Sequence, residues 1–268
     1  MGEKVRNLKI PEVKICGLTS LEEAEFLNQV NADYAGFVFV EKSKRNITFP
    51  QAKKIQNLLS QDIKQVAVTV SPNRKLCQKI EEAGFDILQI HGKLEEKVLE
   101  DTKIPIWRAC NIERVEELEY LEHHENIAAY VVDAKIAGGG KTFDWKACQA
   151  VVQKKAYYFH GKKFVLAGGL NSENVRDGIK IFAPDVIDVS SSVEIVLKEK
   201  ERNLEIETSL KESFQDRQRR ISFNIEAGFT KIDSEGKITR KADKFTTRKD
   251  RQLIIEFVRK VREYEKDG

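Results

Sequence analysis

The chain has 268 residues, of which 41% are hydrophobic and 33% are charged, which is enough for one (β/α)8 barrel or two small domains. Its 46 basic and 43 acidic residues leave a formal charge of only +3, a balance that argues against a nucleic-acid partner. The N-terminus has no signal-peptide pattern and no apolar run approaches the ~18 residues of a membrane helix. We therefore expect a cytoplasmic protein with no membrane partner.

Short apolar runs alternate with amphipathic helical runs along the chain. The apolar runs do not alternate with polar residues, which is typical of parallel strands buried on both faces. Eight strands are predicted, at Val13–Cys16, Tyr34–Phe39, Gln65–Val70, Ile87–Ile90, Ile106–Ala109, Ala129–Asp133, Phe164–Ala167 and Val186–Val189. Helices are predicted at Leu21–Gln29, Gln51–Leu59, Arg74–Ala83, Glu95–Glu100, Glu113–Leu121, Trp145–Val152, Ser172–Ile179 and Gln252–Tyr264.

This alternation predicts an α/β fold, a (β/α)8 TIM barrel. A doubly wound open sheet fits the same pattern, but it usually carries a GxGxxG turn after its first strand, and this chain has none there. A barrel places its chemistry at the carboxyl ends of the strands. Chemically capable residues fall at those ends: Cys16, Arg45, His91, Asp133, Gly168, Gly169, Ser190 and Ser191.

The segment 195–246 breaks this rhythm. It is rich in Lys, Arg and Glu, and Leu197–Gln218 has the composition of a charged helix. Arg220–Ile225 and Phe229–Ile232, followed by the polar Asp233–Thr239, favour a β-hairpin. We predict one TIM-barrel domain over residues 1–268, with residues 195–246 as a charged insert of α/β-hairpin character between the eighth strand and the last helix. The insert could cover the pocket or contact a second subunit, but because insertions cost little entropy we expect it to have no catalytic part.

Two of the apolar runs end in residues that can transfer protons. Val13–Gly17 stops at the thiol of Cys16 and a glycine, and Ala128–Lys135 carries Asp133. At the ends of two parallel strands, a thiol and a carboxylate can face one pocket and move protons in opposite directions. A thiolate needs a lowered pKa, which Lys14 cannot easily supply if its side chain points away from the pocket; backbone dipoles or the substrate are the alternatives. Burial would raise the pKa of an aspartate that serves as an acid.

Three more blocks accompany these two: Lys42–Arg45, Gln89–Gly92 and Gly138–Trp145. Together, from about Val13 to Glu194 and again from Thr247, the blocks resemble the phosphoribosylanthranilate isomerases of tryptophan biosynthesis. The resemblance implies an Amadori rearrangement of N-(5-phosphoribosyl)anthranilate to 1-(2-carboxyphenylamino)-1-deoxyribulose 5-phosphate, the third step from chorismate. It implies Cys16 as general base and Asp133 as general acid, with no metal and no cofactor.

The same resemblance implies how the phosphosugar substrate is bound. Arg45 would pair with the anthranilate carboxylate, since a guanidinium and a carboxylate match bidentately. Gln89, His91 and Lys141 would lie near the substrate, although His91 is as readily a structural imidazole. The phosphate would bind at the loops after the seventh and eighth strands, through Gly168, Gly169, Ser190 and Ser191. We expect a monomer or a homodimer.

Three departures from the family, one of them the insert at 195–246, and three rival functions bear on this interpretation. Ser192 stands where the family usually has Gly, so this turn must keep a negative φ or tolerate strain, and Ala137 and Gly139 alter the glycine-rich loop. The related isomerase of histidine biosynthesis uses two aspartates, one at the first strand, where this chain has Cys16. The lysine motif of indole-glycerol-phosphate synthase is not found. A phosphosugar-binding or interaction protein on a decayed barrel, with the insert as its working part, is disfavoured by the joint presence of Cys16, Arg45 and Asp133.

Overall fold

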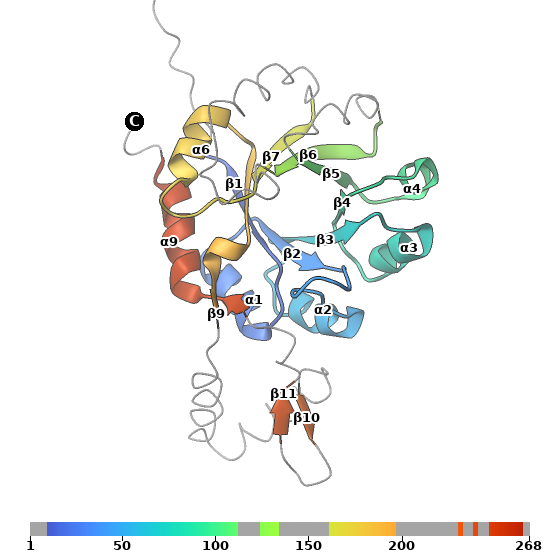
Figure 1. Ribbon diagram of the computed structural model, residues 1–268, viewed down its shortest axis with the longest axis horizontal. Coiled ribbons are helices and arrows are strands. Elements are labelled where there is room, and N and C mark those ends of the chain that lie inside the picture. Colours follow the sequence, from blue (N-terminus) through green and yellow to red (C-terminus); the bar gives the residue numbers. More distant parts are fainter. Residues whose placement is uncertain are drawn as a thin grey trace, which may run out of the picture.

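The computed structural model describes residues 10–111, 124–133, 161–196, 230–232, 238–240 and 247–264. Within these, eight parallel strands close into a barrel in sequence order (Figure 1). The strands are β1 (Glu12–Cys16), β2 (Tyr34–Val38), β3 (Lys64–Val70), β4 (Ile87–His91), β5 (Ile106–Asn111), β6 (Ile127–Asp133), β7 (Lys163–Ala167) and β8 (Val186–Val189). The last strand pairs with the first, with Lys14 opposite Asp188. The predicted TIM barrel is confirmed, and the open sheet is wrong because such a sheet has no pairing between its first and last strands.

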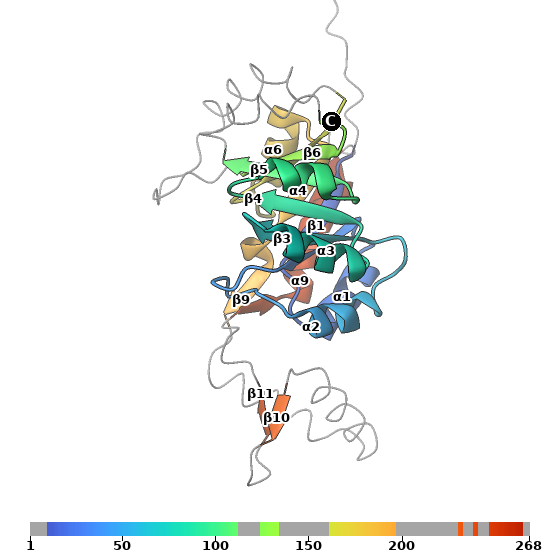
Figure 2. The ribbon, with the colours of Figure 1, turned by 90° about the vertical axis from the view of Figure 1, so that its right-hand side faces the viewer.

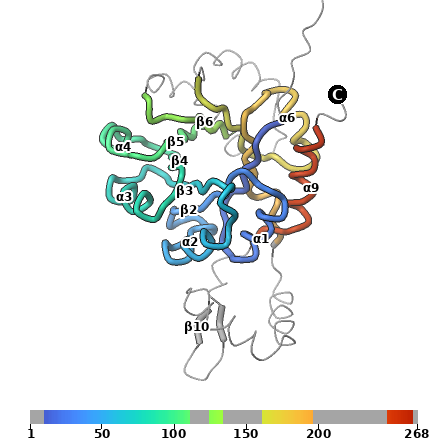
Figure 3. Tube along the Cα trace, turned by 180° about the vertical axis from the view of Figure 1, so that it is seen from behind, coloured from blue at the N-terminus to red at the C-terminus, as the bar shows by residue number. Residues whose placement is uncertain are grey.

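Helices surround the barrel (Figure 3). They are α1 (Leu21–Gln29), α2 (Phe49–Gln56), α3 (Arg74–Glu82), α4 (Glu96–Asp101), α6 (Val175–Phe182) and α9 (Arg251–Arg262). Their starts follow from capping side chains: Ser20 and Glu23 form a capping box on α1, and Asp250 caps α9 by accepting from the amide of Leu253. The helices predicted at Glu113–Leu121 and Trp145–Val152 lie outside the described residues.

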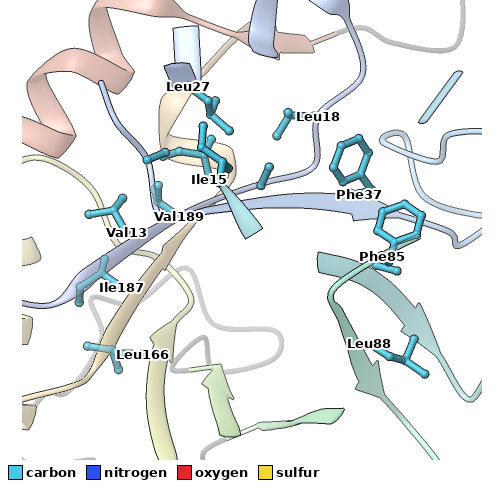
Figure 4. Packing of buried hydrophobic residues seen from close by; sticks show 14 of the residues in the cluster. Val13, Ile15, Leu18, Leu27, Phe37, Phe85, Leu88, Leu166, Ile187 and Val189 are labelled. Carbon is cyan, nitrogen blue, oxygen red and sulfur yellow. The ribbon is translucent and has the colours of Figure 1, made fainter. Parts of the chain in front are cut away.

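Two hydrophobic layers hold the barrel together. Because side chains alternate along a strand, Val13 and Ile15 of β1 point outward and pack under the helices together with Leu27 of α1 (Figure 4). The even-numbered residues of β1 point into the barrel, where Tyr34 and Trp107 fill the interior with ring centroids 4.9 Å apart. Each fully buried large apolar side chain contributes about 1.5–3 kcal/mol to folding, so the two layers make the barrel a rigid support for the strand ends.

A short antiparallel ladder joins the chain that follows β8 to the chain that precedes α9. β9 (Glu194–Val196) pairs with β12 (Thr247–Lys249), so that Val196 lies opposite Thr247. Between them, β10 (Thr230–Ile232) pairs with β11 (Ile238–Arg240) (Figure 2). The predicted helix Leu197–Gln218 and the predicted strand Arg220–Ile225 lie outside the described residues. In the part of the chain that is described, no helix has both the length and the apolarity needed to cross a membrane.

Candidate active site

Cys16 ends β1 with its side chain inside the barrel and only 9% of its surface exposed. The neighbouring strand makes room for it, because Gly36 lies opposite Cys16 and a Cβ at Gly36 would come within 2.7 Å of Sγ. Burial raises the pKa of the Cys16 thiol, and the charge of Lys14 opposes that rise. The thiol therefore sits at the carboxyl end of the barrel, as the sequence predicts.

Lys14 also points into the barrel, one layer below the thiol. Its side chain is fully buried, and Nζ donates to Oδ2 of Asp188 at 2.7 Å. Burial tends to lower the pKa of Lys14, but the charges of Asp188 and Cys16 outweigh burial and the net pKa is raised. Lys14 thus stays protonated beside Cys16. The sequence left the effect of Lys14 on the thiol dependent on whether its side chain points away from the pocket, and the side chain points into the barrel.

Asp133 ends β6, a further strand of the same barrel. Ala129 and Val131 of β6 face the interior, and Asp133 is the next residue in that alternating series. Burial raises the pKa of Asp188, and the charge of Asp133 raises it further. Asp133 is partly exposed at the mouth of the barrel. β6 is separated from β1 by two strands on one side and four on the other. The thiol and the carboxylate therefore enter the barrel mouth from well-separated strands.

His91 is a neutral imidazole in this setting. Burial, followed by the charges of Lys14 and Arg108, lowers the pKa of His91 to about 4. Nε2 of His91 lies 2.8 Å from Nε2 of Gln89, so the two side chains are within hydrogen-bonding distance of each other. Both side chains belong to β4 and face the interior, which brings Gln89 and His91 into the same pocket as Lys14.

Arg45 lies on the loop after β2, with its side chain laid over Gly17. A Cβ at Gly17, whose φ is +89°, would clash with Cδ of Arg45, so the glycine after the thiol is needed for the arginine. Nε and Nη2 of Arg45 donate to the two carboxylate oxygens of Glu194 at 2.5 and 2.7 Å. Burial alone would raise the pKa of Glu194, but hydrogen bonds from Arg45 and the charge of Lys249 lower it to about 2.

Lys249 is a functional candidate that the sequence reasoning missed. Its side chain is fully buried, and Nζ donates to Oε1 of Glu194 at 2.7 Å and to the carbonyl of Ser190 at 2.9 Å. Oγ of Ser190 in turn donates to the carbonyl of Cys16 at 2.9 Å. The available signal was the return of the family-like pattern at Thr247, which places Lys249 and Asp250 before the last helix.

The predicted phosphate loops lie side by side after β7 and β8. Gly168 and Gly169 both have positive φ, at 85° and 66°, where other residues would be strained. Ser190 and Ser191 lead into a short 3-10 helix, η3 (Ser191–Val193). Ser192 does not have positive φ, so the unstrained alternative holds, and its hydroxyl donates to the carbonyl of Leu170. The two loops are thereby tied together. Lys141 and the altered loop at 137–140 lie outside the described residues.

The chain is similar to known proteins of one family. The model of a family described as N-(5'phosphoribosyl)anthranilate (PRA) isomerase matches residues 13–204. The N-(5'-phosphoribosyl)anthranilate isomerase of Streptococcus mutans is 38% identical over 185 residues, which are 68% of this chain and 89% of that protein. The isomerase of Thermoanaerobacter pseudethanolicus is 37% identical over 189 residues, with the same shares of 68% and 89%.

A solved structure gives the same result at the level of the fold. The phosphoribosyl anthranilate isomerase of Thermotoga maritima superposes with a TM-score of 0.66 at 25% identity, covering 94% of this chain and 98% of that chain. The family match begins at the first barrel strand and includes the strand ends that carry Cys16 and Asp133. Since the match extends over most of the sequence, the chain belongs to the N-(5'-phosphoribosyl)anthranilate isomerase family.

Proposed function

We propose that Cys16 is the general base and Asp133 the general acid in the conversion of N-(5-phosphoribosyl)anthranilate to 1-(2-carboxyphenylamino)-1-deoxyribulose 5-phosphate. As a member of its family, the chain is an isomerase of tryptophan biosynthesis, and we place the reaction third from chorismate. One observation carries the assignment: a buried thiol and a partly exposed carboxylate both face the carboxyl end of one barrel, from β1 and β6. Chemistry in TIM barrels takes place at that end.

The two groups divide the rearrangement between them. Asp133, in its acid form, gives its proton to the furanose ring oxygen while the bond from that oxygen to C1′ breaks and the anilino nitrogen supplies its lone pair. The resulting C1′ iminium makes the C2′ proton acidic, and the Cys16 thiolate removes it to give an enamine. Ketonisation returns a proton to C1′, so no redox partner is needed. Each proton transfer is worth on the order of 10²–10⁴-fold in rate.

Lys14 supports the base role by electrostatics. Burial disfavours the thiolate, but the buried ammonium of Lys14 stabilises a negative charge on Sγ. Asp188 in turn compensates the charge of Lys14 when the thiol is protonated. The neutral ring of His91 adds no charge to the pocket, and with Gln89 it offers hydrogen-bonding groups to the sugar hydroxyls.

The remaining residues would bind the two ends of the substrate. Arg45 would grip the anthranilate carboxylate through its free N–H groups, with Lys141 as a second cation for that moiety. Gly168, Gly169, Ser190 and Ser191 would surround the 5′-phosphate, since backbone amides and hydroxyls at these two loops suit an anion.

The domain organisation follows the same proposal. We place one barrel domain over residues 1–268, with residues 195–246 as an insert between β8 and the last helix. The ladder between β9 and β12 supports this, because it holds the two ends of the insert together. The barrel can then close without the intervening residues.

A steady-state isomerase assay on the purified protein tests the function, following loss of the ribosylamine substrate. Wild type should turn over, and Cys16→Ala and Asp133→Asn should not. A wild-type protein that binds ribulose 5-phosphate yet never turns over the substrate would instead be a phosphosugar-binding barrel. An active wild type with two active variants would leave the reaction in place and move the acid and base to other residues.

A further inference from the structure

We propose that Glu194 is a positioning residue that holds the Arg45 guanidinium in the orientation from which it binds the anthranilate carboxylate, and that Lys249 fixes Glu194. The inference rests on the proposed role of Arg45. It assigns to Glu194 and Lys249 a function in substrate recognition, although neither side chain needs to touch the substrate.

The hydrogen bonds leave Arg45 able to bind a second carboxylate. A guanidinium has five N–H groups, and Glu194 takes one from Nε and one from Nη2, at 2.5 and 2.7 Å. Both N–H groups of Nη1 and the second of Nη2 remain, and one N–H from each of these nitrogens forms the other bidentate edge of the same plane. Glu194 therefore occupies the edge nearer the backbone and leaves the outer edge for a ligand.

Glu194 is itself held in place by the buried amine of Lys249, whose pKa burial lowers while the charge of Glu194 opposes that shift. Oε1 of Glu194 accepts from Lys249 at 2.7 Å, and the two side chains are 5% and 0% exposed. Nζ of Lys44 lies 3.5 Å from Oε2. A carboxylate with cations on both oxygens has little freedom to turn, so it fixes the guanidinium plane of Arg45. Without it, the long arginine side chain would have to be ordered by the ligand at an entropic cost.

The same lysine links this clamp to the loop after β8. Nζ of Lys249 binds the carbonyl of Ser190, and the hydroxyl of Ser190 binds the carbonyl of Cys16. The main-chain amide of Lys249 donates to the buried carboxylate of Glu23 at 2.8 Å. Lys249 is thus fixed from both its main chain and its side chain, and it sets Glu194 relative to the strand end that carries the thiol.

A positioning role for Glu194 and a purely electrostatic role predict opposite changes in product affinity when the charge of Glu194 is removed. Three cations, Lys44, Arg45 and Lys249, surround the single carboxylate of Glu194. Neutralising that carboxylate makes the cluster more positive, which by charge alone would strengthen binding of any anion. If Glu194 positions Arg45, the same change weakens binding of ligands that carry the anthranilate carboxylate and spares ligands that lack it.

The test compares two ligands that differ only in that carboxylate: the product, 1-(2-carboxyphenylamino)-1-deoxyribulose 5-phosphate, and 1-phenylamino-1-deoxyribulose 5-phosphate. Dissociation constants are measured by calorimetry for wild type, Glu194→Gln, Arg45→Ala and Glu12→Gln. Glu12→Gln is the matched control, because Glu12 pairs with Lys163 and accepts from Tyr34 within the barrel, at the first residue of β1. Glu194→Gln should weaken the product on the order of tenfold, leave the phenylamino compound within about twofold, and raise KM more than it lowers kcat.

The outcomes separate this inference from the function it rests on. If Arg45→Ala discriminates between the two ligands and Glu194→Gln does not, the positioning role of Glu194 is overturned and the role of Arg45 stands. If Glu194→Gln strengthens binding of both ligands, Glu194 acts only through its charge. If it weakens binding of both ligands equally, and Glu12→Gln does the same, the effect is structural. If Arg45→Ala itself fails to discriminate, both assignments fall. Circular dichroism of each variant shows that the barrel is folded.

Discussion

Nζ of Lys14 lies 2.7 Å from Oδ2 of Asp188 inside the barrel, one layer below the thiol of Cys16. The two residues face each other across the seam where the last strand meets the first. Burying an ion pair costs several kcal/mol per ion, so a pair at this place calls for a functional reason. The charge of Lys14 acts directly on the thiol, and the pair therefore links closure of the barrel to the protonation state of the proposed base.

Replacing Lys14 by Met should lower the stability of the barrel and raise the pKa of Cys16, the proposed base. The variant leaves Asp188 buried without its cation, so the free energy of unfolding should fall by roughly 3–5 kcal/mol. It also removes the charge that favours the thiolate, so the pKa of Cys16 should rise further above its ordinary value. The rise of kcat/KM with pH should then move to higher pH, measured with substrate at concentrations well below KM.

A double variant provides the control for this prediction. Lys14→Met with Asp188→Leu removes both charges, and a well-packed apolar pair of similar volume often restores the stability that a broken buried ion pair loses. The double variant should unfold near the wild-type denaturant midpoint and show a smaller shift of the pH profile than Lys14→Met, because the charge of Asp188 opposes that of Lys14 at the thiol. A wild-type pH profile in Lys14→Met would rule out Lys14 as the group that stabilises the thiolate.

Cys16→Ala should abolish turnover without unfolding the barrel. The substitution removes one sulfur at a site with 9% exposure, which costs little packing, but it removes the proposed base, worth on the order of 10²–10⁴-fold in kcat. Binding of ribulose 5-phosphate should be unchanged because the phosphate loops are intact. A kcat above about a tenth of wild type would exclude Cys16 as the base, given that factor.

Asp133→Asn should lower kcat by a similar factor while changing KM little. The amide keeps the shape of the side chain but has no labile proton for the ring oxygen, so the loss falls on the chemical step. Pre-steady-state measurement of substrate binding separates the two constants. A variant impaired only in KM would make Asp133 a binding residue and require another acid.

The neutral state of His91 predicts a pH dependence of stability. Burial lowers its pKa from 6.5 to about 4 in the folded chain. Between these two pH values the unfolded chain binds a proton that the folded chain does not, so lowering the pH favours unfolding. This contribution is complete above pH 6.5 and is lost as the pH falls towards 4, up to about 3 kcal/mol.

His91→Gln provides the comparison. Urea unfolding of both proteins between pH 4 and 7 should show a steeper loss of free energy in wild type, with the two curves parallel above pH 6.5. Equal slopes over the whole range would mean that His91 becomes protonated in the folded protein as readily as in the unfolded chain.

The strands, and the positions of Cys16 and Asp133 at two strand ends, could be predicted because each leaves a local signal. All eight predicted strands are present with ends within two residues of the prediction, since apolar runs of this kind are typical of a parallel barrel. The orientation of Lys14 had no such signal. A strand buried on both faces does not alternate in polarity, so the sequence does not tell which face lines the interior.

The clamp on Arg45 was missed for a different reason. Glu194 and Lys249 are 55 residues apart in sequence and meet only because β9 and β12 pair. In a chain with 33% charged residues, one Glu and one Lys at that separation carry no pairing information. Only the pairing of β9 with β12 shows that Glu194 and Lys249 are buried together beside Arg45.

The pairing of β9 with β12 also defines how the proposed insert can be removed. Val196 and Thr247 are opposite each other in an antiparallel pair, and a two-residue Asn-Gly turn joins strands at that separation. Replacing residues 197–246 by Asn-Gly should therefore leave a folded barrel, with Glu194 and Lys249 still paired. We expect kcat and KM close to wild type, because the proposed acid, base and carboxylate clamp all remain in place.

A longer deletion is the matched control for the insert. Replacing residues 194–249 by Asn-Gly also removes Glu194 and Lys249, so it should weaken product binding even if the barrel folds, whereas the shorter deletion should not. Size-exclusion chromatography of the shorter deletion tests for a subunit contact, which a change from dimer to monomer at unchanged activity would reveal. If kcat collapses in the shorter deletion while circular dichroism shows a folded barrel, residues between β9 and β12 complete the active site and the insert is not a passive addition.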